Sequence, residues 1–443
     1  MFSMTTPAIE KELILINPIV NPRTFHFLIN IIQKMSTGNP IPYSLLTLAA
    51  LTPKDYKVKI INQKQFWSDR DFTGGKLVGI SCLTSTALEA YRLASKFRQA
   101  GSRVVLGGPH ATVLADEASA YADSVVIGEV ESVWSQVIKD FENGRLQKVY
   151  KGEPLEDFFT PVYDYFLHMD PRVLRLAGVH IARGCKYHCD FCVRISQWLR
   201  FIKLEQVVEL IKRIKKAKRS FFNRPQVIFR CDNIYSSPRY AKELFKEMIP
   251  LGVSWIANSS IDIGFDDEAL RLAKSSGCKL FLIGFETIHP KDYPKTSLKQ
   301  IHSVEDYKIA IKNIRAHGIA IMGSFIIGLD QYSQFDYLKL LWFLILSRIW
   351  FIALLVLTPF PGADLFDRLK KENRILTFNW RKYDMLTCVF KPKQTSVFSV
   401  YVWFWLIRYL SVFFSPSLLF PWLVLLVSWW VGYRLSRWFF HGF

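Results

Sequence analysis

The chain alternates short, β-branched apolar runs with helical patterns, and this alternation constrains its fold more than any other feature. In the first part of the 443 residues, strands are expected at 12–18, 56–62, 77–82, 102–108 and 124–129. Helices are expected around 43–51, 85–100, 110–118 and 131–142. Strands that alternate with helices in this way form parallel sheets covered on both faces. We therefore expect a doubly wound α/β domain over residues 1–155.

A second alternating series follows the linker "KGEPLEDFFTP" (151–161), which is rich in proline and acidic residues. Its strands are expected near 178–182, 226–231, 253–258, 278–284, 319–327 and 351–357. Six strand–helix units indicate a partial or complete parallel barrel, whose chemistry lies at the C-terminal ends of its strands. We place this barrel domain at residues 165–395.

Two adjacent glycines, Gly107 and Gly108, end the fourth expected strand of the first domain. Doubly wound sheets bind ligands in the crevice outside their strand ends, and glycines there let a ligand approach the backbone. The same pair also suits a tight strand-to-helix turn. The pattern alone fits both interpretations.

Three of the seven cysteines fall within "ARGCKYHCDFC" (182–192), just after the first strand of the barrel. Cys185, Cys189 and Cys192 have C-x3-C-x2-C spacing, so three thiolates can converge on one metal centre. Zinc would need a fourth ligand, which His188 could supply. An iron–sulfur cluster usually takes four cysteines, and three would leave one iron open. The remaining cysteines are not expected to be ligands: Cys82, Cys231, Cys278 and Cys388.

The C-x3-C-x-aromatic-C pattern, with Phe191 before the last cysteine, resembles the cluster motif of the radical S-adenosylmethionine (SAM) superfamily. The resemblance extends over about 178–395. It implies a [4Fe–4S] cluster on three catalytic cysteines, Cys185, Cys189 and Cys192, with the open iron bound to SAM. In that family one electron then cleaves SAM to a 5′-deoxyadenosyl radical. A reducing donor such as flavodoxin or ferredoxin is therefore an expected partner.

The next two strand ends of the barrel also match the superfamily. "VIFRCDN" (227–233) places Asp232 where relatives have an acid for the methionine amino group, although Asn233 replaces a second acid that many relatives carry. "WIANSSIDI" (255–263) has Ser260 where relatives often have Arg, which weakens any expectation of a basic contact there.

The fourth and fifth strand ends complete the resemblance. "LIGFET" (282–287) implies that Glu286 faces the nucleoside, and "GSFIIGLD" (323–330) implies that Gly328 lets the backbone approach adenine. The SAM site that the resemblance implies consists of Phe191, Asp232, Ser260, Glu286 and Gly328.

The first domain resembles the Rossmann-like cobalamin-binding domain that precedes some radical SAM barrels. The likeness rests on "IPYSLLTLAA" (41–50), "GISCLTSTALEA" (79–90), "VVLGGPHATV" (104–113) and "VVIGEVES" (125–132). It implies that Ser81 and Leu83 of a Ser-x-Leu motif, with Gly107 and Gly108, line the nucleotide tail of cobalamin. The D-x-H-x-x-G loop, which supplies a cobalt-ligating histidine, is missing. Any bound cobalamin is thus expected to lack a protein nitrogen on cobalt.

The sequence from 396 to 443 is strongly apolar, and six of the thirteen tryptophans fall in the last 41 residues. The 25 residues from Tyr409 to Tyr433 carry no charge, and about 20 apolar residues suffice to span a bilayer. We expect a hydrophobic helical tail that holds the protein on the cytoplasmic face of the membrane, as a re-entrant hairpin or an in-plane anchor. The alternative is a helical cap on the barrel.

The charge balance and the N-terminus bear on partners and compartment. The net charge is +19, from 57 basic and 38 acidic residues, which favours anionic partners. The basic run "KRIKKAKR" (212–219) is typical of a solvated helix face, and it could also attract anionic lipid or RNA phosphate. The start lacks a secretory signal pattern and the cysteines suggest no disulfide framework, so a cytoplasmic location is expected.

Together these features predict a cobalamin-type radical SAM enzyme, a C-methyltransferase that acts on an unactivated carbon of a lipid or other membrane-associated substrate. The domain order and the closing "NWRKYDMLTCVFKPK" (379–393) resemble hopanoid-modifying members. A tRNA methylthiotransferase would need three more cysteines in the first domain, which has only Cys82, so nucleic acid is not an expected partner. A non-catalytic membrane scaffold of the same fold is the other alternative, and the three intact cysteines argue against it.

Overall fold

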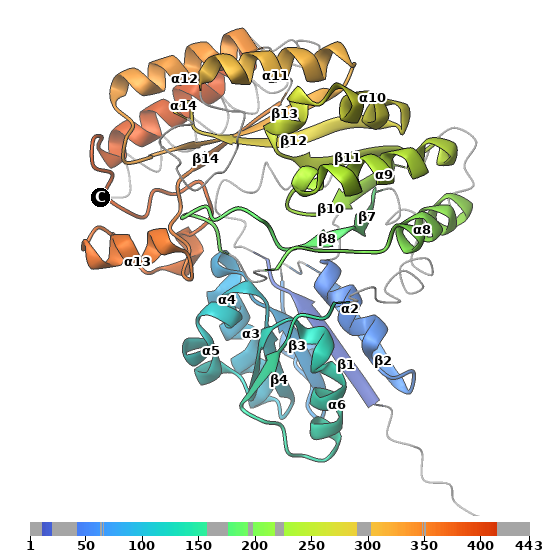
Figure 1. Ribbon diagram of the computed structural model, residues 1–443. Coiled ribbons are helices and arrows are strands. Elements are labelled where there is room, and N and C mark those ends of the chain that lie inside the picture. The colour runs from blue at the N-terminus through green and yellow to red at the C-terminus, as the bar shows by residue number, and fades with distance from the viewer. Residues whose placement is uncertain are drawn as a thin grey trace, which may run out of the picture.

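The computed structural model describes residues 11–19, 42–62, 64, 66–156, 176–193, 198–217, 226–289, 303–347, 349 and 351–413. These residues build two parallel β-sheets, each flanked by helices (Figure 1). In this view the N-terminal sheet forms the lower unit, and the later strands and helices form the upper unit. The two alternating series of the sequence therefore correspond to two separate sheets.

The first sheet has six parallel strands in the order β2-β1-β3-β4-β5-β6. Its strands are β1 (Lys11–Asn17), β2 (Tyr56–Asn62), β3 (Leu77–Ser81), β4 (Arg103–Gly107), β5 (Ser124–Gly128) and β6 (Val149–Gly152). Its helices are α2 (Tyr43–Leu51), α3 (Ala87–Gln99), α4 (Pro109–Val113), α5 (Ala115–Tyr121) and α6 (Trp134–Glu142). Five strands lie where the sequence predicts them. Strand β6 has four residues, of which only Tyr150 is buried, so it carries too weak an apolar signal to be predicted.

Helices cover both faces of this sheet because successive side chains of a strand point to opposite sides. In β1, Ile14 and Ile16 pack in a cluster with buried residues of α3, whereas Leu13 and Leu15 pack with residues of α2 and α6. Burial on both sides explains why β1 is an unbroken apolar run rather than an alternating one.

The second sheet also has six parallel strands, in the order β14-β13-β12-β11-β10-β7. Its strands are β7 (Leu176–His180), β10 (Gln226–Arg230), β11 (Ser254–Ser259), β12 (Cys278–Glu286), β13 (Ala320–Ile327) and β14 (Phe351–Val356). The helices that follow them are α8 (Leu204–Ala217), α9 (Pro238–Met248), α10 (Asp267–Ser275), α11 (Val304–Ala316), α12 (Gln334–Ser347) and α13 (Asp364–Lys371). Among the described strands β7 and β14 lie at opposite edges, so the six β/α units form an open, partial barrel.

A short antiparallel hairpin lies between β7 and α8. It pairs β8 (Ala182–Arg183) with β9 (Arg200–Phe201). Strands of two residues have no hydrophobic periodicity, so the sequence does not predict them. The hairpin positions the cysteine run, the segment from Cys185 to Cys192, which begins two residues after β8.

The first helix of the apolar C-terminal stretch, α14 (Val397–Phe413), packs on the barrel. Its residues Val400, Phe404 and Ile407 are buried in the barrel core. In the part of the chain that the structure describes, no helix is both long enough and apolar enough to cross a membrane. Up to residue 413, one face of α14 is thus a cap on the barrel, which was the alternative interpretation of the sequence, and the expected membrane attachment stays a prediction. Residues 414–443 of the expected tail lie outside the described residues.

The packing of α14 can be tested with two substitutions of the same kind. Phe404 is 2% exposed and Phe398 is 77% exposed, on the same helix. We expect Phe404→Ala to lower the free energy of unfolding by about 3–5 kcal/mol, because it opens a cavity in the core. Phe398→Ala should change it by no more than about 0.5 kcal/mol. Denaturant titration of both variants measures the difference, and equal losses would contradict the cap.

Candidate active site

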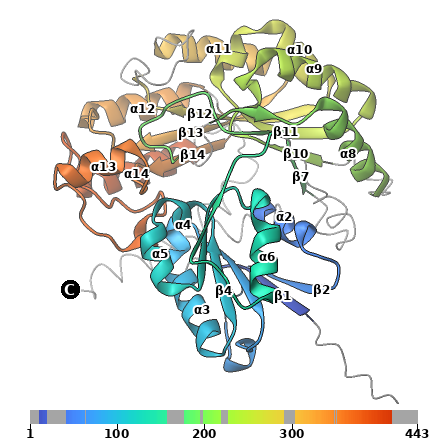
Figure 2. The same cartoon turned by 60° about the horizontal axis from the view of Figure 1, so that its bottom comes forward.

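The carboxyl ends of the two sheets line one cavity of about 1030 Å³, at the junction of the units seen in Figure 2. Ser81, Gly107 and Gly128 bring the ends of β3, β4 and β5 to this cavity, and the ends of β7, β10, β11 and β12 line its other side. Parallel sheets and barrels bind ligands at these strand ends. One ligand space therefore serves both units.

The three cysteines of the motif all line this cavity. Cys185 and Cys189 are partly buried and Cys192 is exposed, and the Cys192 backbone N–H donates to the Cys189 carbonyl at 3.1 Å. Burial and the neighbouring Cys192 raise the pKa of the Cys189 thiol to about 12. Among the described residues no three His, Cys, Asp or Glu side chains lie close enough together to hold a single metal ion. Three thiols around one shared space suit the donor chemistry of an iron–sulfur cluster, which is larger than one ion.

Asp232 and Ser260 lie at the ends of neighbouring strands and line the same cavity, as does Phe191. Asp232 has no side-chain hydrogen bond to a residue that the structure describes, and burial raises its pKa. Asn233 accepts hydrogen bonds at 2.9 Å from the backbone N–H groups of Tyr235 and Ser260. The amide that replaces a second acid thus ties the end of β10 to the end of β11.

Glu286 lines the cavity at the end of β12 in an unusual backbone conformation. Its φ is +61°, a left-handed value that costs a non-glycine residue free energy. Its carboxylate folds back over Gly284, where an added Cβ would collide with it. Burial raises the pKa of Glu286 to about 7. The site therefore holds a carboxyl group that can carry or release a proton near neutral pH.

The N-terminal side of the cavity is formed by Ser81, Gly107 and Gly108. Gly108 has a φ of +99°, and a Cβ built there would lie 3.1 Å from the backbone N and O of Cys82. The structure therefore requires glycine at 108 for the turn. Because Gly107 and Gly108 have no side chains, a large ligand can also approach the end of β4. The glycine pair can therefore serve both the tight turn and ligand binding.

Two sequence-predicted site residues lie outside the cavity lining. Leu83 is 45% exposed, because the chain turns into a short 3-10 helix directly after it. A Cβ built on Gly328 would contact Val400 of α14 at 3.7 Å, and the Gly328 backbone N–H donates to the Tyr337 hydroxyl at 3.2 Å. The role of Gly328 beside the adenine therefore stays a prediction, with Val400 of the cap helix as its neighbour.

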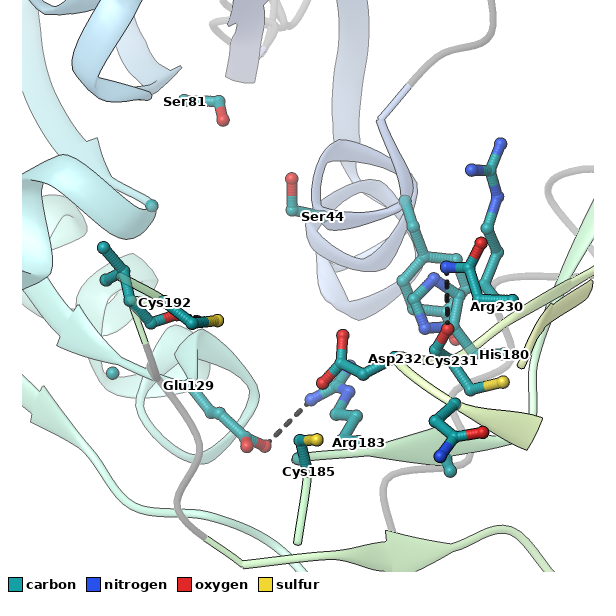
Figure 3. A pocket seen from close by; sticks show the side chains of 18 of the residues that line it. Ser44, Ser81, Glu129, His180, Arg183, Cys185, Cys192, Arg230, Cys231 and Asp232 are labelled. Carbon is teal, nitrogen blue, oxygen red and sulfur yellow. Dashed lines mark hydrogen bonds and ion pairs between the residues drawn. The ribbon is translucent and has the colours of Figure 1, made fainter. Parts of the chain in front are cut away.

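An arginine–glutamate network that the sequence does not reveal joins the two units at the cavity. Arg183 of β8 pairs with Glu129, which follows β5, at 2.8 Å, and also with Glu131. Arg200 of β9 pairs with Glu129 and donates to the Leu155 carbonyl. The four side chains are at most 16% exposed. Figure 3 shows Glu129 and Arg183 meeting beside Cys185, so the network fixes the hairpin from which the cysteine run starts.

A second contact between the units places the ring of Tyr43 of α2 against that of His180 of β7, with centroids 3.7 Å apart and planes tilted by 32°. Burial and the nearby Arg183 lower the pKa of His180 to about 3, so its imidazole is neutral. Both rings line the cavity. The sequence assigns neither residue a role, although Tyr43 lies within the quoted segment 41–50, and only the three-dimensional structure brings the two rings together.

The four other cysteines are free and buried, as expected of small apolar side chains: Cys82, Cys231, Cys278 and Cys388. Cys231 also borders the cavity, between Arg230 and Asp232. Burial raises the pKa of Cys388 to about 11, and the thiols of all four are protonated at neutral pH.

Comparison with known proteins agrees with this geometry. Residues 179–343 match the model of the radical SAM superfamily. The chain is 32% identical to bacteriochlorophyllide d C-12(1)-methyltransferase of Chlorobaculum tepidum, over 80% of this chain and 78% of the relative. It is 23% identical to hopanoid C-2 methylase of Rhodopseudomonas palustris, over 76% and 65%. A solved structure with a similar fold is that of TsrM from Kitasatospora setae, a radical SAM methyltransferase with cobalamin and a [4Fe–4S] cluster bound. The TM-score is 0.62 at 15% sequence identity, and the match covers 82% of this chain and 78% of that chain.

The arginine–glutamate network can be tested through Glu129, which accepts from two arginines. Glu129→Gln leaves both guanidinium groups under-compensated, so we expect it to lower the free energy of unfolding by about 2–3 kcal/mol, somewhat below the cost of breaking a fully buried pair. Glu243→Gln is the matched control. Its ion pair with Arg239 spans 3.0 Å, but the two side chains are 46% and 89% exposed, so the loss should stay under about 1 kcal/mol. Equal stability of the two variants in urea would show that the network is not a structural tie.

Proposed function

Since the chain belongs to the cobalamin-binding branch of the radical SAM superfamily, we propose that it methylates an unactivated carbon of an apolar, membrane-associated substrate. The observation that carries this proposal is the shared cavity, into which both the cysteine run and the Gly107–Gly108 edge open. The cofactors of the enzyme are a [4Fe–4S] cluster, SAM and cobalamin. Neither a tRNA methylthiotransferase nor a non-catalytic scaffold is favoured, because the relatives described above are carbon methyltransferases.

The residues of the cavity divide into two sets according to the group they would hold. Cys185, Cys189 and Cys192 would ligate three irons and leave the fourth for SAM. Ser81, Gly107 and Gly108 would receive the nucleotide tail of cobalamin at the opposite side. When bound, these groups supply a 5′-deoxyadenosyl radical and a transferable methyl group, which is the chemistry that an unactivated carbon requires.

Two carboxyl groups of the barrel have separate tasks in this proposal. Asp232 has no partner among the described residues and would accept hydrogen bonds from the amino group of SAM. Glu286, with its pKa of about 7, can both donate and accept, so it suits the hydroxyl groups of the nucleoside. Apolar side chains such as Leu45, Val105 and Val126 line the N-terminal side and limit the access of water to a reactive radical.

An apolar surface patch supports the membrane part of the proposal. Helix α12 has exposed apolar side chains at helical spacing, and so does α14, which is in contact with α12. The exposed side chains are Phe335, Leu338, Trp342, Leu346, Phe398, Val402 and Leu406. Contiguous exposed apolar patches mark interaction sites, and the apolar sequence 414–443 continues directly from α14. We therefore propose that this patch and the C-terminal tail hold the enzyme on the cytoplasmic face of the membrane, where flavodoxin or ferredoxin would reduce its cluster.

The central chemistry is tested with single cysteine variants. Changing Cys185, Cys189 or Cys192 to Ala should abolish both 5′-deoxyadenosine formation and the transfer of a deuterated methyl group from SAM. The assay incubates reconstituted protein anaerobically with labelled SAM and membrane lipid extract, and mass spectrometry follows the product. Cys388→Ala, which removes a buried thiol away from the cavity, is the control and should retain about four irons per chain. Undiminished SAM cleavage by a motif variant would contradict the assignment.

The membrane proposal is tested by sedimentation with anionic liposomes. The full chain should pellet with them, and removal of residues 414–443 should release it while leaving α14 in place on the barrel. The double change Trp342→Ser and Leu346→Ser should reduce liposome binding about tenfold or more, since each buried apolar side chain gains about 1.5–3 kcal/mol. Ile309→Ser is the control, because Ile309 is 44% exposed on a different helix, α11. Full-length protein that stays in the supernatant would contradict membrane attachment.

A further inference from the structure

Arg230 lines the cavity without a side-chain hydrogen bond or ion pair to any residue that the structure describes. This sets it apart from Arg183 and Arg200, which pair with Glu129. A guanidinium group carries its charge at every physiological pH and has five N–H donors. A positive group without a partner inside a ligand cavity indicates that the ligand supplies the partner.

The position of Arg230 is built by two strands at the edge of the barrel. It ends β10 opposite His180 of β7, the edge strand. Its side chain crosses Gly178 so closely that a Cβ at this glycine would lie 3.1 Å from the Arg230 Nε. The glycine therefore leaves the guanidinium its room. Figure 3 shows Arg230 on the other side of the cavity from Cys192 and Glu129.

The electrostatic surroundings leave the Arg230 charge uncompensated. Burial lowers the pKa of Arg230, and no carboxylate opposes this effect. Asp232 is two residues away, yet its pKa is raised by burial alone, so the two groups do not form a pair. His180 is neutral, with a pKa lowered to about 3, and cannot offset the charge. The Arg230 side chain is nevertheless exposed to the open cavity, so water solvates the guanidinium until a ligand with an opposite charge replaces that water with charge-assisted hydrogen bonds.

The cofactors do not account for this arginine. The carboxylate and amino groups of SAM belong at the open iron and Asp232, on the cysteine side, and the nucleotide tail of cobalamin belongs at the Gly107–Gly108 edge. We propose that Arg230 binds a carboxylate or phosphate group of the substrate. The substrate is then an amphipathic molecule, with an apolar body at the reacting end and an anionic group held in a bidentate pair with the guanidinium. This inference rests on the proposed function and names the substrate class for that site.

The test compares pairs of probes that differ only in the anionic group. Protoporphyrin IX and its dimethyl ester represent a tetrapyrrole carboxylate, and hexadecyl phosphate and hexadecanol represent a lipid headgroup. Calorimetric titration of the cofactor-loaded full chain should show that the anionic member of one pair binds at least about tenfold more tightly, as expected of a hydrogen bond to a charged group. The pair that shows the preference identifies the source of the anionic group.

Three variants decide whether Arg230 causes the preference. Arg230→Gln should abolish it, Arg230→Lys should retain part of it, and Lys212→Gln, which removes the same charge from the outer face of α8, should leave it intact. A ligand role also predicts that Arg230→Gln keeps its iron and cobalamin content and does not lower the melting temperature of the free protein. Equal binding of both members of each pair to the wild type, or an unchanged preference in Arg230→Gln, would overturn the inference. Failure of the proposed function would show differently, as absence of SAM cleavage by the wild type.

Discussion

Two arginines of one short hairpin share Glu129, and this shared carboxylate determines how the halves of the cavity meet. Arg183 and Arg200 face each other across β8 and β9, while Glu129 follows a strand of the other sheet. A partly buried ion pair adds little net stability, because desolvation offsets most of its attraction. Its role is to hold strand β8 in place, from which Cys185, Cys189 and Cys192 follow, at the cavity that the glycine edge of the N-terminal sheet also lines.

The chain strengthens this junction by returning to the N-terminal unit after the barrel. The Trp380 indole N–H donates to Glu117 of α5 at 2.9 Å, and its ring lies 5.4 Å from that of His110. Trp380, Tyr383 and Val389 belong to the same buried cluster as α3. The two units are thus joined at a second place, by residues that do not line the cavity.

Much of this arrangement follows from sequence, because strand periodicity, turn glycines and the cysteine spacing are local signals. Ten of the twelve predicted site residues line the cavity; these are strand-end or motif positions, and the order of parallel strands brings them together. Leu83 and Gly328 do not line it, since a local turn and the cap helix α14 decide their surroundings. Glu129, Arg183 and Arg230 lie within the quoted segments, but the sequence assigns them no role, because their roles depend on contacts between strands that are distant in sequence. The apolar composition of α14 likewise could not distinguish a membrane anchor from a barrel cap with one exposed face.

The central claim is that the cluster and cobalamin occupy one cavity, and electron paramagnetic resonance tests it most directly. Protein loaded with cob(II)alamin and a reduced [4Fe–4S] cluster should give a spectrum split or broadened by coupling between the two spins. Gly108→Trp fills the glycine edge, so it should keep the cluster signal and lose both cobalamin and the coupling. A wild-type spectrum that is the simple sum of two isolated signals would contradict the account, because it would place the two groups in separate sites.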